Sequence, residues 1–139
     1  MPIWKQDISL ERINQFSPNT IIDVLGIRFI EIGDDYLKAS MPVDQRTHQP
    51  YGLLHGGASV VLAETLGSTG AMLATDPRNR VVGLDINANH MRGVREGLVI
   101  GTATPLHVGR TTQVWNIQIV DENDKLVCVS RLTMAVLTP

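Results

Sequence analysis

The chain has 139 residues, of which 43% are hydrophobic and 19% are charged, and its formal net charge is −2. This length suits a single domain over residues 1–139, large enough to bury roughly two-thirds of its extended surface. The small net charge excludes a basic footprint for nucleic acid, and the composition excludes a disordered chain. Cys128 is the single cysteine, which excludes an internal disulfide and argues against a thiolate metal site. We expect a cytoplasmic protein, because the N-terminal residues lack the apolar core and cleavage site of a signal peptide.

The first predicted element is a short helix. Ser9 is expected to cap a helix over residues 9–16, because its hydroxyl can accept a hydrogen bond from a free N–H of the first turn. The core face of this helix is predicted from a spacing of three and comprises Leu10, Ile13 and Phe16.

A β-hairpin is predicted next. Residues 37–43 alternate between apolar and polar side chains, which is the period-two signal of a half-buried strand. The preceding stretch LGIRFIEI pairs with this strand across Gly33-Asp34-Asp35. The apolar face of the second strand is expected to hold Leu37, Ala39, Met41 and Val43.

A run of small and apolar residues over 56–75 predicts a long helix that is buried and apolar nearly all round. Glu64 is the only Asp, Glu, Lys or Arg between Arg46 and Asp76. The helix positions three and four residues away from Glu64 hold no cation that could neutralise it. A carboxylate in such a place has either a partner from elsewhere in the fold or a chemical task. We take the chemical task as the working hypothesis.

After the helix come four extended stretches, VVGLDINANHM, LVIGTATPLHV, RTTQVWNIQIV and LVCVSRLTMAVL. Short turns join them, so the pairing should be antiparallel. Three of the stretches have an apolar face at period two. The predicted faces are Val82, Leu84, Ile86 and Ala88 in the first, Trp115, Ile117 and Ile119 in the third, and Cys128, Leu132, Met134 and Val136, interrupted by Ser130, in the last.

These elements predict an α+β fold in which one curved antiparallel sheet wraps a single long helix. Strands of ten to twelve residues span roughly 33 to 40 Å. A helix of about nineteen residues spans roughly 28 Å, so the sheet is long enough to enclose it. Trp4 and Trp115 are predicted to anchor the core or an interface.

The helix entrance carries the sequence His55-Gly56-Gly57. Two glycines let the backbone approach a ligand, and the first N–H groups of a helix have no intrahelical acceptor. A carbonyl oxygen placed there would be polarised, as in an oxyanion site for acyl transfer. Glu64 lies roughly 12 Å further along the helix axis, too far for both groups to reach one carbonyl. The separation points to a second chain.

The strings QPYGLLHGGASVVLAETLGS, VVGLDINANHMRGVREG and LHVGRTTQVW resemble the hotdog-fold acyl-CoA thioesterases, and most closely the 1,4-dihydroxy-2-naphthoyl-CoA hydrolase group. The resemblance covers nearly the whole chain. It implies a curved sheet around a central helix, a dimer built on a continuous sheet, active sites at the subunit interface and usually a homotetramer. It also implies hydrolysis of an acyl-CoA to free acid and CoA in menaquinone biosynthesis, with no cofactor because CoA is part of the substrate.

The resemblance assigns roles to five catalytic residues. Glu64 would be the catalytic carboxylate, acting as nucleophile or as general base for water. The N–H of Gly56 would polarise the thioester carbonyl, and Ser68 would help to place the attacking water. Gln49 and His55 would lie in the loop that shapes the acyl site.

The CoA contacts implied by the resemblance fall on three segments of this chain. Arginines beside glycines in these segments could meet the phosphates of the nucleotide. Arg110 directly follows Gly109, whereas other members place a small polar residue there, so the roles of the residues in that turn stay open. The matching positions are Gly83, His90, Met91, Arg92, Gly93, His107, Val108, Gly109, Arg110, Thr111 and Thr112.

Each functional interpretation has a structural alternative. Glu64 could be a structural carboxylate paired with a cation from another strand, and His55 could serve only as a helix cap. His90 and the arginines Arg92, Arg95 and Arg110 could be solvated surface side chains. The histidines lack the spacing of typical metal ligands, which argues against a metal site. A Gly-x-Ser-x-Gly elbow is absent, which argues against a serine hydrolase.

The sequence alone leaves two other functions open. The protein could be a dehydratase or hydratase of acyl thioesters, or a module that binds acyl-CoA without turnover. The acyl group is also open, because it depends on which side chains line the pocket. The candidates for that lining are Leu53, Val60, Val61, Met72 and Met91.

Overall fold

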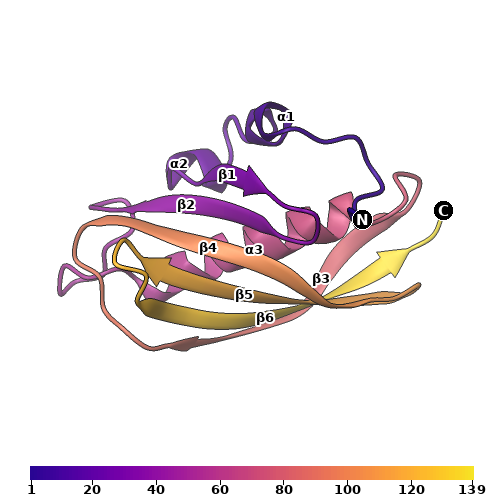
Figure 1. Cartoon of the computed structure of the whole chain (residues 1–139). Coiled ribbons are helices and arrows are strands. Elements are labelled where there is room, and N and C mark those ends of the chain that lie inside the picture. The colour runs from indigo at the N-terminus through magenta and orange to yellow at the C-terminus, as the bar shows by residue number, and fades with distance from the viewer.

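The computed structural model describes residues 1–139. One long helix lies against a sheet formed by all the strands, and two short helices lie near one edge (Figure 1). The elements in chain order are α1 (Leu10–Gln15), α2 (Ile21–Val24), β1 (Arg28–Ile32), β2 (Leu37–Val43), α3 (Gly56–Leu73), β3 (Arg80–His90), β4 (Gly97–Val108), β5 (Thr112–Asp121) and β6 (Leu126–Leu137).

The sheet has six strands in the order β1-β2-β4-β5-β6-β3, and every neighbouring pair is antiparallel. The hairpin of β1 and β2 and the short turn between β5 and β6 formed where the sequence predicted them. Helix α3 contacts five of the six strands, β2 to β6. The α+β prediction of a curved antiparallel sheet around one long helix is therefore confirmed. No helix is long and apolar enough to cross a membrane.

Two glycines let α3 lie close to the sheet. A Cβ added at Gly67 would stand 2.6 Å from Cδ2 of Leu132, and one added at Gly70 would stand 2.8 Å from the ring of Trp115. Real Cβ atoms keep more than 3.0 Å from such neighbours. The LGSTG segment therefore serves the close packing of helix on sheet.

The apolar faces predicted for three strands point into the core. The period-two pattern works because successive side chains alternate between the two faces of a strand. All of these positions have exposed fractions of 8% or less, namely Leu37, Ala39, Met41, Val43, Trp115, Ile117, Ile119, Cys128, Ser130, Leu132, Met134 and Val136.

The face predicted for β3 is wrong at Val82 and Leu84 and confirmed at Ile86 and Ala88, which pack against the core. The register of β3 against β6 shifts between Gly83 and Asp85, so that Leu84 is an extra residue in the ladder. A bulge of this kind reverses the faces of the residues on either side of it. Val82 and Leu84 are accordingly 39% and 61% exposed, while Ile86 stays packed against the core.

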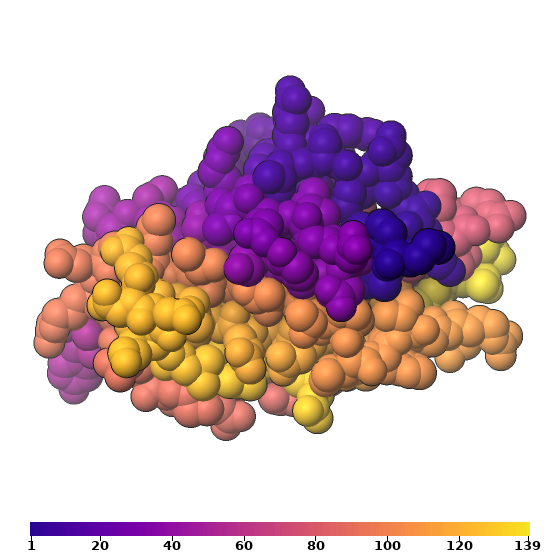
Figure 2. All heavy atoms as spheres, in the orientation of Figure 1, coloured from indigo at the N-terminus to yellow at the C-terminus, as the bar shows by residue number.

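The N-terminal segment covers the C-terminal end of α3 and one side of the sheet (Figure 2, indigo). Trp4 stacks on Trp115 with ring centroids 6.2 Å apart, which confirms that both rings anchor the core. The side chain of Gln6 donates to the carbonyl of Met72 at 2.9 Å and thus satisfies one of the free carbonyls at the helix end.

Helix α1 is capped as predicted, because the Ser9 hydroxyl accepts from the Arg12 N–H. Ile13 is buried and Leu10 packs against the core. Phe16, expected on the same face, is 60% exposed because the helix ends at Gln15 and the chain turns there.

The two edges of the sheet differ. Beside β1, the side-chain amide of Asn14 donates to the carbonyl of Phe29 at 3.0 Å and accepts from its N–H at 2.8 Å, as a neighbouring strand would. Strand β3 has no such cover, and Val82 and Leu84 are exposed along it. An open edge with exposed apolar side chains is suited to pairing with another chain, whereas a blocked edge is not.

Candidate active site

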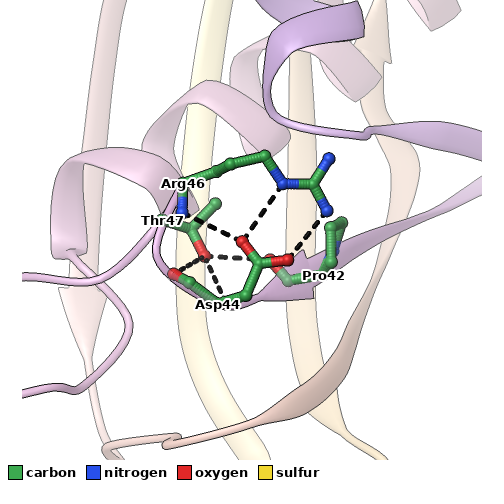
Figure 3. A network of polar contacts seen from close by, with 4 residues as sticks. All are labelled: Pro42, Asp44, Arg46 and Thr47. Atoms are coloured by element: carbon green, nitrogen blue, oxygen red, sulfur yellow. Dashed lines mark hydrogen bonds and ion pairs between the residues drawn. The ribbon is translucent and has the colours of Figure 1, made fainter.

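A tight turn after β2 starts the loop that leads to α3 (Figure 3). The carboxylate of Asp44 accepts three hydrogen bonds from Arg46, from its backbone N–H at 2.9 Å, from Nε at 3.1 Å and from Nη2 at 2.8 Å. These charge-assisted bonds lower the pKa of Asp44 from 3.8 to about 2. The Thr47 hydroxyl donates to the carbonyl of Pro42 at 2.9 Å, so the turn is tied to the end of the strand.

The next residues form a small hairpin that positions Gln49. His48 pairs with Leu54 in an isolated bridge, and Gln49 N–H donates to the carbonyl of Leu53 at 2.8 Å. Gly52 has φ of 78°, a left-handed conformation that glycine adopts without strain. The side-chain oxygen of Gln49 accepts from the N–H of Tyr51. The loop is therefore held in place by its own hydrogen bonds.

His55 caps α3 with its ring. Its Nδ1 accepts from the N–H of Gly57 at 2.8 Å, which uses one of the free donors of the first turn. The N–H of Gly56 makes no hydrogen bond inside the chain. The ring of His90 lies over Gly56, and a Cβ added there would stand 2.8 Å from its Nε2. Glycine at this position keeps both the imidazole and a free N–H at the helix entrance.

A cavity of about 400 Å³ opens at this entrance. It brings together Gln49 from the loop, Gly56 from the helix and His90 from the end of β3, three residues that the sequence placed in the site. Met91, Arg92 and Gly93, predicted to contact CoA, complete one wall. Leu53 and Met91 are in the lining, as proposed for the pocket. Sequence reasoning missed Leu54, Ser59 and Val127, whose apolar or small side chains carry no signal of their own.

Glu64 lies in a second cavity, of about 440 Å³. The prediction that its carboxylate is buried is wrong for the single chain, where the side chain is exposed. Glu64 forms no ion pair. The alternative in which it is a structural carboxylate paired with a cation from another strand is therefore also wrong. Its Oε2 lies over Gly83 of β3, 3.2 Å from where a Cβ would stand, so glycine leaves room for the carboxylate.

Ser68 lines the same cavity as Glu64, one helical turn further on. Its hydroxyl has only a weak contact, 3.9 Å to the sulfur of Met134, and is free to bind water. Val61 is also in the lining, whereas Val60, predicted with it, lines neither of these two cavities. Ile21 and Ile22 of α2 form the opposite wall. Sequence reasoning missed α2, because a four-residue helix is too short to give a periodic pattern.

The turn over residues 107–112 lies at the other end of the sheet from His90. His90 pairs with Cys128, which pairs with Ile119, whereas Thr112 begins β5 seven residues earlier. Seven residues of strand span roughly 24 Å. Within one chain, the two predicted CoA segments therefore do not meet. The residues that lie apart from the helix entrance are His107, Val108, Gly109, Arg110, Thr111 and Thr112.

Comparison with known proteins agrees with this geometry. The Thioesterase superfamily matches residues 51–128, which hold the helix entrance, α3 and most of the sheet. The 1,4-dihydroxy-2-naphthoyl-CoA hydrolase of Escherichia coli is 56% identical over 97% of this chain and 99% of its own length. The proofreading thioesterase EntH of Cronobacter turicensis is 52% identical over 97% of this chain and 98% of its own.

Solved structures carry the same fold. The crystal structure of thioesterase HI1161 from Haemophilus influenzae superposes with a TM-score of 0.96 at 51% identity, covering 98% of this chain and 95% of that one. A sheet that wraps one helix in this way is the hotdog fold. The chain belongs to the thioesterase superfamily and is an acyl-CoA thioesterase of the hotdog type, which hydrolyses a thioester bond.

Proposed function

We propose that this thioesterase acts on an aromatic acyl-CoA such as 1,4-dihydroxy-2-naphthoyl-CoA, with Glu64 and the N–H of Gly56 as its two reacting groups. The substrate rests on the 56% identity to the Escherichia coli hydrolase over nearly the whole length of both chains. The mechanism rests on one observation, that an unpaired carboxylate and an unpaired helix N–H lie in separate cavities of the same chain.

The two groups stand eight residues apart on one helix, roughly 12 Å along the axis. One thioester carbon cannot touch both groups at that separation, because an attacking oxygen and an oxyanion donor must each lie about 3 Å from the reacting atoms. A site made from Glu64 of one subunit and Gly56 of its partner removes the difficulty. Each dimer then has two such sites, related by symmetry.

Strand β3 is the edge that best supports this dimer. It pairs with β6 on one side only and carries the exposed Val82 and Leu84, and Gly83 beside them faces the carboxylate of Glu64. Antiparallel pairing of two β3 strands about a two-fold axis brings the His90 end of one strand beside the Arg80 end of the other. The turn over residues 107–112 of one subunit then approaches the helix entrance of its partner. Both predicted CoA segments can contribute to one substrate in this arrangement.

The reaction would start when the N–H of Gly56 polarises the thioester carbonyl. Glu64 then either attacks the carbonyl carbon, releasing CoA and forming an anhydride that water hydrolyses to the free acid and the restored carboxylate, or takes a proton from a water that attacks the carbonyl carbon in its place and displaces CoA. The Ser68 hydroxyl, free of any strong hydrogen bond, would orient that water. Single turnover in 18O-labelled water tests the nucleophilic route, because label enters the Glu64 carboxylate only when water attacks the Glu64 carbonyl of the anhydride.

The proposal predicts that Glu64→Gln lowers kcat by about 1,000-fold or more, since the amide is neither a base nor a nucleophile. Glu64 is exposed in the chain and makes no ion pair, so the fold should be unchanged. Glu11→Gln, on the exposed surface of α1, is the matched control and should keep full activity. Release of free thiol is the measurement, and near-normal turnover by Glu64→Gln would refute the role of this residue.

The identity of the acyl group is tested with the same thiol assay on a panel of acyl-CoAs. We expect the highest kcat/KM for fused-ring aromatic acyl groups. The 52% identity to a proofreading thioesterase supports a second candidate, a proofreading role on other acyl thioesters. A flat profile across the panel would favour that candidate and contradict a dedicated naphthoyl substrate. Binding or hydration of the substrate would release no thiol at all.

A further inference from the structure

We propose that His48 is a positioning residue that holds residues 91–93, the cavity wall predicted to contact CoA, beside the loop that carries Gln49. The ring of His48 donates through Nε2 to the backbone carbonyl of Arg95 at 2.8 Å, since a carbonyl oxygen can only accept. This contact joins two segments that lie 47 residues apart in the sequence. The proposal rests on the function proposed above, because it takes residues 91–93 to bind the CoA part of the substrate.

The backbone that follows this wall has little other support. Residues 92–96 lie between β3 and β4, outside any strand. Their backbone makes two hydrogen bonds, one to the ring of His48 through the carbonyl of Arg95, and one to the N–H of Leu54 through the carbonyl of Val94 at 2.7 Å. Both donors belong to the small hairpin that positions Gln49. The hairpin therefore supplies every hydrogen bond that this stretch of backbone makes.

Arg92 stands between two fixed points of the chain. Before it, the N–H of Met91 donates to the carbonyl of Val127 at 2.8 Å. After it, the side chain of Val94 is buried and its carbonyl is bonded to the hairpin. The guanidinium of Arg92 is the cation of this wall, and a phosphate gains from it only at hydrogen-bond distance. The placement of this cation therefore depends on how firmly the hairpin holds the backbone beyond it.

The hairpin itself does not depend on the ring of His48. The N–H of Gln49 donates to the carbonyl of Leu53 at 2.8 Å, and the N–H of His55 donates to the carbonyl of Thr47 at 2.7 Å. These backbone bonds remain when the ring is replaced, so the loop on the acyl side of the site keeps its geometry. Loss of the ring should therefore weaken the binding of CoA and leave the reaction of the thioester unchanged.

The test compares benzoyl-CoA with S-benzoyl-N-acetylcysteamine, which carries the same thioester without the nucleotide. His48→Leu removes the donor, and we expect KM for benzoyl-CoA to rise about fivefold or more while kcat changes by less than about twofold. For the N-acetylcysteamine thioester, kcat/KM should change by less than about twofold. His48→Gln restores an N–H donor at the end of the side chain and should return KM for benzoyl-CoA to within about twofold of normal.

Gln45→Leu is the matched control, because it places the same side chain at an exposed position of the same loop, and it should leave both substrates unchanged. Equal losses on the two thioesters in His48→Leu, no loss on either, or no rescue by His48→Gln would overturn the role of His48.

Arg92→Ala separates this inference from the function on which it rests. It should raise KM for benzoyl-CoA and spare the N-acetylcysteamine thioester, since only the first carries phosphates. If Arg92→Ala shows this selectivity and His48→Leu does not, only the role of His48 is wrong. If Arg92→Ala affects both thioesters alike, the wall does not bind CoA. Absence of thiol release from both thioesters by the unmodified enzyme would overturn the proposed function itself.

Discussion

At the scale of single residues, the structure shows how one turn is held in place for the site beyond it. Asp44 accepts three hydrogen bonds from Arg46, and this contact starts the loop that carries Gln49 and His55. Arg46 is exposed and Asp44 is partly exposed, so water screens their attraction and the geometry of the turn matters more than its energy. We therefore expect the pair to order the loop and to add little to global stability.

The ionisation of Asp44 gives a direct test of this contact. Its pKa is lowered from 3.8 to about 2, so its contribution is complete above about pH 3.8 and is lost as the pH falls through about 2. An NMR titration of the Asp44 carboxyl should give a midpoint near 2 in the unmodified protein. Arg46→Gln should return the midpoint toward 3.8, and an unchanged midpoint in this variant would show that another group holds the carboxylate.

For Glu64, the sequence predicted a special role but not the exposure of its side chain. Its isolation among apolar neighbours pointed to a special carboxylate, and its lack of an ion pair agrees with that prediction. Its exposure in the single chain was not predictable, because the neighbours along a helix do not tell whether a second chain covers one face of it. The position of Gly83 beneath the carboxylate is likewise a tertiary contact between α3 and β3.

At the scale of elements, the predictions succeeded where a pattern is local. The strand faces of β2, β5 and β6 followed from alternation, since each residue simply faces opposite to the one before it. The face of β3 did not, because the bulge at Leu84 arises from pairing with β6 and leaves the apolar alternation in the sequence intact. Helix α2 was missed because four residues make no periodic signal.

Strand β1 provides a prediction at this scale. Asn14 makes two hydrogen bonds to Phe29, one with its side-chain N–H and one with its oxygen. Asn14→Leu removes both and should lower the free energy of unfolding by about 1 to 3 kcal/mol in urea. Gln15→Leu, next along α1 and free of such bonds, should change it by less than about 0.5 kcal/mol. Equal losses in the two variants would mean that helix α1 itself, and not the covered strand edge, explains the effect.

At the scale of the whole molecule, the two edges of the sheet determine how chains can associate. The edge at β1 is blocked by Asn14, while β3 exposes Val82 and Leu84. Leu84→Lys should therefore shift the protein toward monomer in sedimentation experiments and abolish thiol release with it. Val24→Lys on α2 is the control, because Val24 and Leu84 are both 61% exposed. An active dimer of Leu84→Lys would place the interface elsewhere.

The central claim is that each active site takes Glu64 from one subunit and the N–H of Gly56 from its partner. Subunit complementation tests it most directly. Glu64→Ala and Gly56→Pro should each be inactive alone, because proline at the first helical position removes the N–H and its Cβ displaces the ring of His90 in the same subunit. Mixed dimers of the two variants contain one intact site, so random assembly of equal amounts should restore about a quarter of the normal activity. Recovery of that size supports the shared site, and a mixture no more active than its parents would contradict it.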